Sequence, residues 1–273
     1  MINTQNEQPS RHNRQQFKME EISNALKRAE FKAYYQPKVE LFGLDLSGVE
    51  VLARWEHPLF GVLTPDRFLP SVIECGLLNE MTHFLLAQAL SVQKRLSDMS
   101  IRTTMAINIE PSQVADNDFV CALIAQANFK TLATNELTIE ITERNIDFSW
   151  LPKFLKNTAK LKAAGFNLSI DDFGTGYSSL ERICKTPCSE IKIDRTLVRN
   201  MISDNRHLKI IQIIVNIGRT LKLNVVAEGI ETIQQLNLLQ SLGCHQGQGH
   251  LFSNALSSEQ IEQWCIKWAG CIS

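Results

Sequence analysis

The sequence lacks several features that mark broad classes of protein. Its 28 basic and 29 acidic side chains leave a net charge of −1, so it lacks the electrostatic field of a protein that coats nucleic acid or anionic lipid. It has no run of about 18 apolar residues, and its polar start, MINTQNEQPSRHNRQQ, has no apolar stretch of the kind that a secretory signal requires. We therefore expect no membrane insertion, no DNA or RNA polymer as a partner, and a cytoplasmic location.

The cysteines also lack the spacing of a zinc site or a disulfide framework. They are seven in number, scattered, and include no C-x-x-C pair, so reduced thiols are expected. Residues 1–15 have almost nothing to bury and are expected to form a disordered leader or the remnant of a linker. No proline-, glycine- or serine-rich stretch interrupts residues 16–273, which are expected to form one domain with the 44% hydrophobic content of a globular protein.

Short apolar runs alternate with segments of helical periodicity through this domain. The expected strands lie at 32–39, 48–55, 103–109, 136–142, 167–172, 189–194, 222–228 and 244–250. The expected helices lie at 17–29, 78–97, 111–127, 151–164, 206–221, 232–242 and 258–269. This alternation predicts an α/β fold, a (β/α)8 TIM-like barrel, with an open doubly wound sheet as the competing architecture. Only about eight residues join the first two strands, too few for a parallel crossover, so the first strand should run antiparallel to the second.

The alternation of side chains along a strand sorts the polar residues of these strands onto one face. If the leucine and isoleucine side chains of 137–141 pack on helices, Glu140 points into the barrel. The same test places further polar residues inside, at or near the ends of their strands: Glu50, Arg54, Asn108, Asp171, Lys192 and Glu228. Charged side chains are rarely buried unpaired, and active sites of such barrels lie at the C-terminal mouth. For any one residue, an independent barrel-lining salt bridge is the alternative.

The residue types in this set indicate metal-dependent chemistry. Four carboxylates and an asparagine exceed the charge of one lysine and one arginine, so the cluster requires cations. Oxygen ligands without histidine or cysteine favour Mg²⁺ or Mn²⁺ over Zn²⁺. Two such ions are a general device for hydrolysing phosphodiesters, and the adjacent Asp171 and Asp172 allow one carboxylate to bridge them. Lys192 is a candidate for holding the attacking water or neutralising developing charge.

Eight motifs in a fixed order make the sequence resemble the EAL family of cyclic di-GMP phosphodiesterases. They are YYQP (34–37), EVLARW (50–55), INIEPSQ (107–113), EITE (140–143), DDFGTGYSSL (171–180), IKID (191–194), AEGIET (227–232) and QGHLFS (248–253). The resemblance covers residues 20–256. It implies hydrolysis of one phosphodiester of cyclic di-GMP to linear pGpG by a homodimer that uses Mg²⁺ or Mn²⁺ at a two-metal site and is inhibited by Ca²⁺.

The resemblance also implies roles for individual residues. Metal ligands are implied at Glu50, Asn108, Glu140, Asp171 and Asp172. Catalytic roles are implied for Glu228 as the general base or second-metal anchor, for Lys192 as the residue that orients the attacking water, and for Asp172. Substrate contacts are implied for Gln36 with guanine, Arg54 with phosphate, and Gln248. Glu231 is expected to support Glu228, and Glu143 to hold the loop that follows Asp172.

Three departures from the family pattern bear on these expectations. Val51 replaces an alanine on the helix-facing side of its strand, where the larger side chain affects packing more than catalysis. His250 stands where tyrosine is common, and Asn254 with Ala255 where arginine and proline are common, so substrate affinity is affected more than catalytic competence. The alternative function is a catalytically silent EAL domain that acts as a cyclic di-GMP receptor or protein-interaction module. A sugar-phosphate enzyme on a generic barrel is a third hypothesis, which rests on the fold alone.

Overall fold

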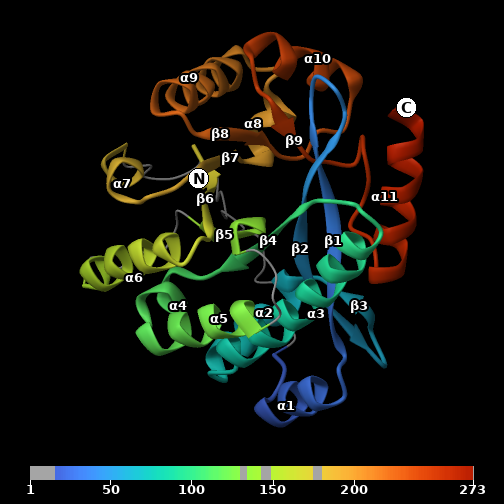
Figure 1. The fold of residues 1–273 in the computed structure, drawn as a ribbon, viewed down its shortest axis with the longest axis vertical. Coiled ribbons are helices and arrows are strands. Elements are labelled where there is room, and N and C mark those ends of the chain that lie inside the picture. Colours follow the sequence, from blue (N-terminus) through green and yellow to red (C-terminus); the bar gives the residue numbers. More distant parts are fainter. Residues whose placement is uncertain (1–15, 130–133, 143–148, 175–179, 273) are drawn as a thin grey trace, which may run out of the picture. The chain divides into compact units, whose positions relative to one another are not determined.

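The computed structural model describes residues 16–129, 134–142, 149–174 and 180–272 of the chain (Figure 1). These residues form two compact units. The first contains the described residues up to Lys32 together with Ala53–Met81, and the second contains Ala33–Leu52 and the described residues from Thr82 onward. The expected leader, residues 1–15, lies outside the described residues.

The first unit is built around aromatic side chains. It contains α1 (Met19–Lys27), β3 (Gly61–Leu63) and α2 (Pro65–Glu74). The ring centroids of Phe17 and Phe31 lie 4.5 and 5.0 Å from that of Trp55. The indole N–H of Trp55 donates to Glu30 Oε2 at 2.9 Å, so the polar edge of this buried ring is satisfied.

The second unit is a closed barrel of eight strands. Around the barrel these are β1 (Phe31–Glu40), β9 (Gln246–Gly247), β8 (Asn224–Ala227), β7 (Glu190–Ile193), β6 (Asn167–Phe173), β5 (Leu137–Thr142), β4 (Thr104–Ile109) and β2 (Leu46–His57), with β2 pairing again with β1. From β2 through β4 to β9 all neighbours are parallel, whereas β1 is antiparallel to β9 and therefore to β2. The predicted barrel and its antiparallel first strand are confirmed. A tight turn, in which the N–H of Glu40 donates to Asp45 O at 2.8 Å, replaces the crossover helix.

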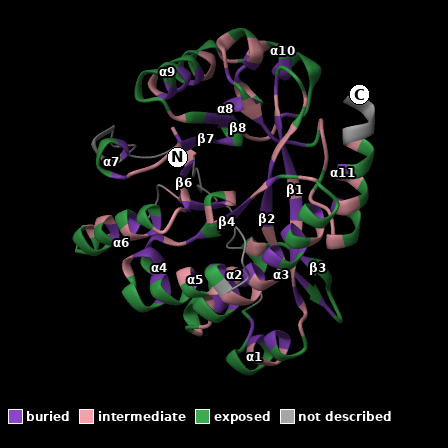
Figure 2. Ribbon diagram, viewed as in Figure 1, coloured by how far each residue is buried: buried purple, intermediate pink, exposed green. Residues whose placement is uncertain are grey.

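Helices connect the barrel strands and cover their outer faces, so that the strands are largely buried (Figure 2). They are α3 (Leu78–Asp98), α4 (Pro111–Ala115), α5 (Asn117–Phe129), α6 (Leu151–Ala163), α7 (Leu180–Lys185), α8 (Arg195–Asn200), α9 (Asn205–Leu221), α10 (Ile233–Leu242) and α11 (Ser258–Ile272). The segment 111–127, predicted as one helix, is divided at Asp116, whose carboxylate accepts from the N–H of Asp118 at 2.9 Å and so caps α5. A capping box formed by Thr232 and Gln235 begins α10.

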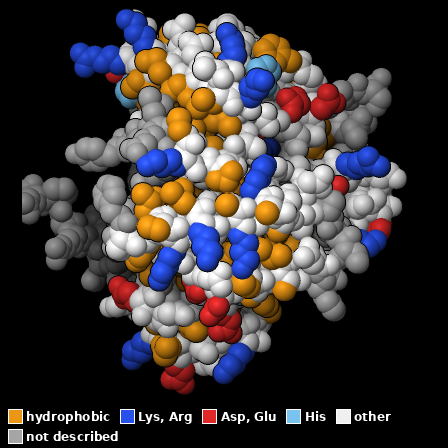
Figure 3. Space-filling view, turned by 60° about the vertical axis from the view of Figure 1, so that its left-hand side comes forward, with side chains coloured by type: hydrophobic (Ala, Val, Ile, Leu, Met, Phe, Trp, Pro, Cys, Tyr) orange, Lys and Arg blue, Asp and Glu red, His pale blue; other side chains and the backbone are white. Residues whose placement is uncertain are grey.

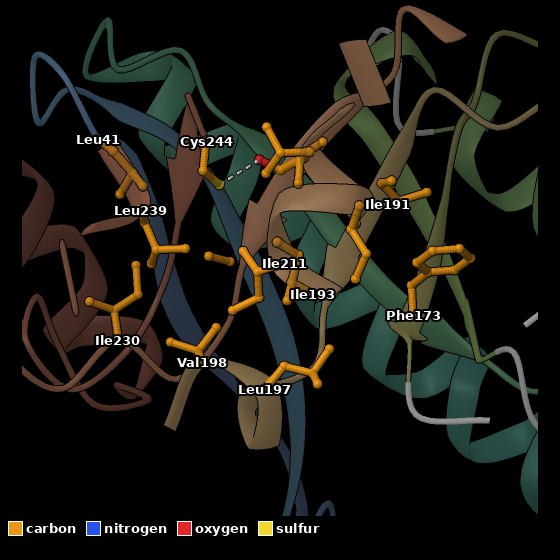
Figure 4. Close-up of a cluster of buried hydrophobic side chains, with 14 of the residues drawn as sticks. Leu41, Phe173, Ile191, Ile193, Leu197, Val198, Ile211, Ile230, Leu239 and Cys244 are labelled. Atoms are coloured by element: carbon orange, nitrogen blue, oxygen red, sulfur yellow. Dashed lines mark hydrogen bonds between the residues drawn. The ribbon is translucent and has the colours of Figure 1, made fainter. Parts of the chain in front are cut away.

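Apolar side chains on the outer faces of β6 and β7 pack against α8 and α9 (Figure 4). Phe173, Ile191 and Ile193 of these strands lie in one buried cluster with Leu197 and Ile211. Because this face of the strands is apolar, the polar side chains that alternate with it point into the barrel.

The same cluster contains Cys244, which is fully buried and whose Sγ–H donates to the carbonyl oxygen of Val225 at 3.4 Å (Figure 4). Six cysteines are free thiols, as expected from their spacing: Cys75, Cys121, Cys184, Cys188, Cys244 and Cys265. Within the same part of the chain, none of the helices has the length and hydropathy of a membrane span.

Candidate active site

Lys192 of β7 is a fully buried cation surrounded by carboxylates. Its Nζ lies 2.7 Å from Glu140 Oε2 and from Glu228 Oε1, 3.2 Å from Glu50 Oε2 and 3.5 Å from Asp171 Oδ1. These carboxylates come from β2, β5 and β6 and from the residue after β8. Because the strands that carry them are parallel, the side chains meet at one mouth of the barrel. The structure thus brings together five of the residues singled out by strand alternation.

The pKa values of this cluster reflect its excess of negative charge. Burial alone would lower the pKa of Lys192, but the four carboxylates raise it well above its usual value, so the ammonium stays charged. Burial raises the pKa of Glu228 to about 8. Burial and the charge of Glu50 raise the pKa of Glu140 well above its usual range. For Glu50 itself, burial is outweighed by Lys192 and by amide hydrogen bonds, so its pKa is lowered.

Two amide side chains complete the cluster. Asn108, exposed at the mouth, donates from Nδ2 to Glu50 Oε1 at 2.8 Å. Gln248 donates from Nε2 to Glu50 Oε2 at 2.5 Å and to Glu228 Oε1 at 3.1 Å. The amide oxygen of Gln248 is buried and has no hydrogen-bond partner among the described residues. A buried acceptor of this kind is expected to meet a group that the protein does not itself supply, such as a cation or a water molecule.

A β-bulge at the end of β6 places a second aspartate beside the first. The register between β6 and β7 shifts between Ile170 and Phe173. Asp172 adopts a left-handed conformation with φ 57°, and its N–H donates to Asp171 Oδ1 at 2.8 Å. Strict alternation would point two successive carboxylates to opposite faces. Instead, carboxylate oxygens of Asp171, Asp172 and Glu228 all lie within 4.8 Å of one another, an arrangement that could hold a metal ion.

Gly249 allows the ends of β8 and β9 to approach closely. A Cβ at this position would lie 2.2 Å from the carbonyl oxygen of Ile230 and 2.3 Å from its nitrogen. The approach lets the N–H of Gln248 donate to Ala227 O at 2.9 Å and the N–H of Ile230 donate to Gln248 O at 3.1 Å. These backbone bonds hold the side chain of Gln248 beside Glu228.

Of the three residues expected to contact the substrate, Gln36 and Arg54 belong to different units. Gln36 of β1 is half-buried in the second unit, and its Nε2 donates to Ser253 O at 3.2 Å. Because β1 is antiparallel to the other barrel strands, its earlier residues lie toward the mouth. Arg54 belongs to the first unit, where its guanidinium donates to the carbonyl oxygen of Ala53 at 2.8 Å.

Of the two residues expected to support the site, one lies outside the described residues, namely Glu143. The other, Glu231, has an exposed side chain, and its backbone N–H donates to Gln235 Oε1 at 2.8 Å. A buried ion pair that was not predicted from the sequence lies farther inside the barrel, between Lys38 Nζ and Glu190 Oε2 at 2.8 Å. Alternation could have found Glu190, which lies two positions before Lys192 in the same strand.

Comparison with known proteins identifies the family. The family model described as EAL domain matches residues 19–255. The chain is 36% identical over 245 residues to the cyclic di-GMP phosphodiesterase RocR of Pseudomonas aeruginosa, a match that covers 90% of this chain and 62% of RocR. It is also 36% identical over 248 residues to the bifunctional diguanylate cyclase/cyclic di-GMP phosphodiesterase MucR of the same organism, covering 89% of this chain and 36% of MucR.

A solved structure gives the same result. The PaMucR phosphodiesterase in complex with c-di-GMP superposes with a TM-score of 0.84 at 35% identity, covering 89% of this chain and 98% of that chain. The chain spans less than two thirds of the length of the curated relatives, 62% of RocR and 36% of MucR. The family match nevertheless extends over most of the chain and includes every strand of the barrel. The chain therefore belongs to the EAL domain family.

Proposed function

We propose that this protein is a metal-dependent phosphodiesterase that hydrolyses one phosphodiester bond of cyclic di-GMP and releases linear pGpG. The observation that carries the proposal is the convergence of four carboxylates on Lys192 at one mouth of the barrel. The sequence identity to RocR and MucR, both named as cyclic di-GMP phosphodiesterases, supports the choice of substrate.

The residues at the mouth fit a pair of Mg²⁺ or Mn²⁺ ions. The proposed ligands of the first ion are Glu50, Asn108, Glu140 and Asp171, and those of the second are Asp171, Asp172 and Glu228. All are oxygen donors, which these hard cations prefer, and the excess negative charge and the unpartnered oxygen of Gln248 support the fit. Bound cations would supply a water of lowered pKa and positive charge for the phosphate oxygens. Ca²⁺ is expected to inhibit, because its longer and more flexible coordination alters the positions of the reacting groups.

The remaining chemistry is assigned to the chain's own side chains. Lys192 orients the attacking water and offsets negative charge that develops on the phosphate oxygens. Glu228 is assigned to accept the proton of that water or to anchor the second ion, and both roles require its ionised form. Burial raises its pKa to about 8 in the cation-free protein, and a bound cation would favour the ionised form. Gln36 and Gln248 bind the substrate from the mouth, and Arg54 is proposed to contact its phosphate.

The supporting residues act on these groups rather than on the substrate. Glu231 is proposed to support Glu228, and Glu143 to hold the loop that follows Asp172. Both proposals rest on the match of these residues to the family motifs, AEGIET and EITE.

The proposed assembly is a homodimer. On α9, Ile211 and Ile214 are buried in the core, whereas Ile210 and Ile213 are 37% and 58% exposed. On the face shown in Figure 3, apolar side chains are exposed between Lys and Arg side chains. An apolar stripe on a surface helix favours association, and a second copy of this chain is the proposed partner. Light scattering with and without cyclic di-GMP tests the assembly, and Ile213→Lys should weaken it; a monomer under both conditions would refute it.

A turnover assay tests the proposed reaction. The purified chain is incubated with cyclic di-GMP and Mg²⁺ or Mn²⁺, and the products are separated by chromatography and identified by mass spectrometry. We expect pGpG from the wild type and none from Glu50→Ala or Asp171→Ala, because each loses a metal ligand. Glu80→Ala, which removes an exposed carboxylate of α3, is the matched control and should keep full activity. Binding of cyclic di-GMP without turnover would support a receptor function instead.

A further inference from the structure

A second polar tier lies inside the barrel, next to the carboxylate cluster. Lys38 and Glu190 form its ion pair, and they are only 5% and 6% exposed. Ser169 of β6 is paired through its Cα with Glu140 of β5 on one side and with Glu190 of β7 on the other. Paired residues of neighbouring parallel strands present their side chains on the same face of the sheet. Ser169 therefore lies between Glu140, a carboxylate of the cluster around Lys192, and the ion pair of Lys38 and Glu190.

Two buried polar atoms of this tier have no hydrogen-bond partner among the described residues. They are Oγ of Ser169, a residue with no exposed surface, and Oε1 of Glu190, the carboxylate oxygen that does not bind Lys38. Buried hydroxyl and carboxylate oxygens are almost always satisfied, and where the protein provides no partner a buried water molecule commonly does. Because the two residues are direct cross-strand neighbours, one water molecule could satisfy both.

In the carboxylate cluster around Lys192, such a water molecule could orient Glu140. Lys192 holds Glu140 through one oxygen, Oε2, at 2.7 Å. A single contact fixes the position of that oxygen but leaves the plane of the carboxylate free to turn. A second contact, from the side of Ser169 and Glu190, would fix the plane of the Glu140 carboxylate. Contacts of this kind orient the ligands of metal sites.

We propose that Ser169 is a positioning residue for Glu140 and acts, together with the Lys38–Glu190 ion pair, through one water molecule buried in the barrel. The hydroxyl of Ser169 donates to the water, and the water donates to Glu190 Oε1 and to the carboxylate of Glu140. Lys38 holds the other oxygen of Glu190, Oε2, at 2.8 Å and so keeps Oε1 in place to accept. The inference rests on the proposed function only in taking Glu140 as a metal ligand.

The test compares Ser169→Thr with Ser169→Val, two side chains of nearly the same shape of which only threonine keeps a hydroxyl. Mn²⁺ binding to the full chain is measured by calorimetry and by electron paramagnetic resonance, without substrate. We expect Ser169→Val to raise the Kd for Mn²⁺ about tenfold, as losses of supporting contacts at metal sites do, and Ser169→Thr to stay close to wild type. Thr138→Val is the control, because it removes another buried hydroxyl from the barrel, at a residue whose Cα is paired with Ala106 and Asn167 instead.

Wild-type Mn²⁺ affinity in Ser169→Val would overturn the positioning role. If that variant does not fold, Ser169→Ala removes the hydroxyl without adding a methyl group and gives the same comparison, with urea unfolding in EDTA as the check on folding. A high-resolution crystal structure should show solvent density between Ser169 Oγ and Glu190 Oε1. A direct contact without solvent would overturn the role of the water.

The outcome is separable from that of the turnover assay. A protein that does not hydrolyse cyclic di-GMP, yet loses Mn²⁺ affinity on Ser169→Val, refutes the proposed function and supports the positioning role. A protein that hydrolyses cyclic di-GMP, but whose Mn²⁺ affinity is unchanged by Ser169→Val, supports the proposed function and refutes the positioning role.

Discussion

Replacing Glu228 with glutamine should change the way in which the stability of the cation-free protein depends on pH. Burial raises the pKa of Glu228 from 4.5 to about 8. Between these values the native protein keeps the proton that the unfolded chain releases. The unfolded state therefore binds fewer protons than the native state, and wild-type stability falls as the pH rises through this window. In Glu228→Gln this contribution is absent.

The size of the effect follows from the same linkage. Each pH unit inside the window changes the free energy of unfolding by up to about 1.4 kcal/mol per proton, so the wild type should lose about 2–3 kcal/mol through Glu228 between about pH 5.5 and about pH 7.5. Glu140, whose pKa is also raised by burial, contributes a fall of the same sign in both proteins. Glu50, whose pKa is lowered, contributes stability that is lost only at more acidic pH. The difference between the two profiles therefore isolates Glu228.

Urea unfolding in EDTA, followed by circular dichroism at several pH values, measures the two profiles. They should converge near pH 5, and at pH 7.5 the glutamine variant should be the more stable protein. Added Mn²⁺ should stabilise the wild type most at high pH, because the cation binds the ionised carboxylate, and should stabilise the variant less. Glu80→Gln, a change at an exposed side chain of α3, is the control and should follow the wild type. Parallel profiles for wild type and Glu228→Gln would refute the reasoning.

Three further predictions concern packing and local structure. Gly249→Ala places a Cβ 2.2 Å from a carbonyl oxygen, whereas in Gly61→Ala the Cβ meets nothing within 4 Å. In urea unfolding, Gly249→Ala should therefore lower the free energy of unfolding by more than the roughly 1 kcal/mol expected for Gly61→Ala. Equal losses in the two variants would disprove the close approach. Thr232→Ala removes the side-chain cap of α10 and should cost about 1 kcal/mol in the same measurement, and no loss would contradict the capping box. Cys244, whose pKa is raised by burial to about 12, should resist iodoacetamide in the native protein while the exposed Cys121 reacts, as read by mass spectrometry, and rapid labelling of Cys244 would contradict its burial.

The carboxylate cluster around Lys192 could be predicted from the sequence for a physical reason. Outer faces of the barrel strands are uniformly apolar, so every charged side chain at an intervening position must point inward. The antiparallel first strand was equally accessible, because a short connection cannot hold a crossover. Neither the cluster nor the direction of the first strand required a known distance between residues to be predicted.

Other features depend on contacts between segments and could not be predicted in this way. The conformation of Asp172 depends on how the end of β6 pairs with β7. The ion pair of Lys38 and Glu190 joins residues 152 positions apart, and no local pattern selects one partner for the other. The short elements β3, α7 and α8 were missed because segments of this length carry few periods of an apolar pattern. The longer α2 begins with Pro65 and contains Pro70, which interrupts a helical pattern in the sequence.

The bulge in β6 adds the second aspartate without disturbing the packing of the core on either side of it. Ile170 and Phe173 both lie in the outer hydrophobic cluster although they are three positions apart, which regular alternation would forbid. Deleting Asp172 would remove the bulge and restore regular alternation, with Asp171 facing the barrel interior and Phe173 still on the outer face. A second carboxylate can therefore be gained or lost at this point of the strand by inserting or deleting one residue, without turning the side chains that follow it to the other face.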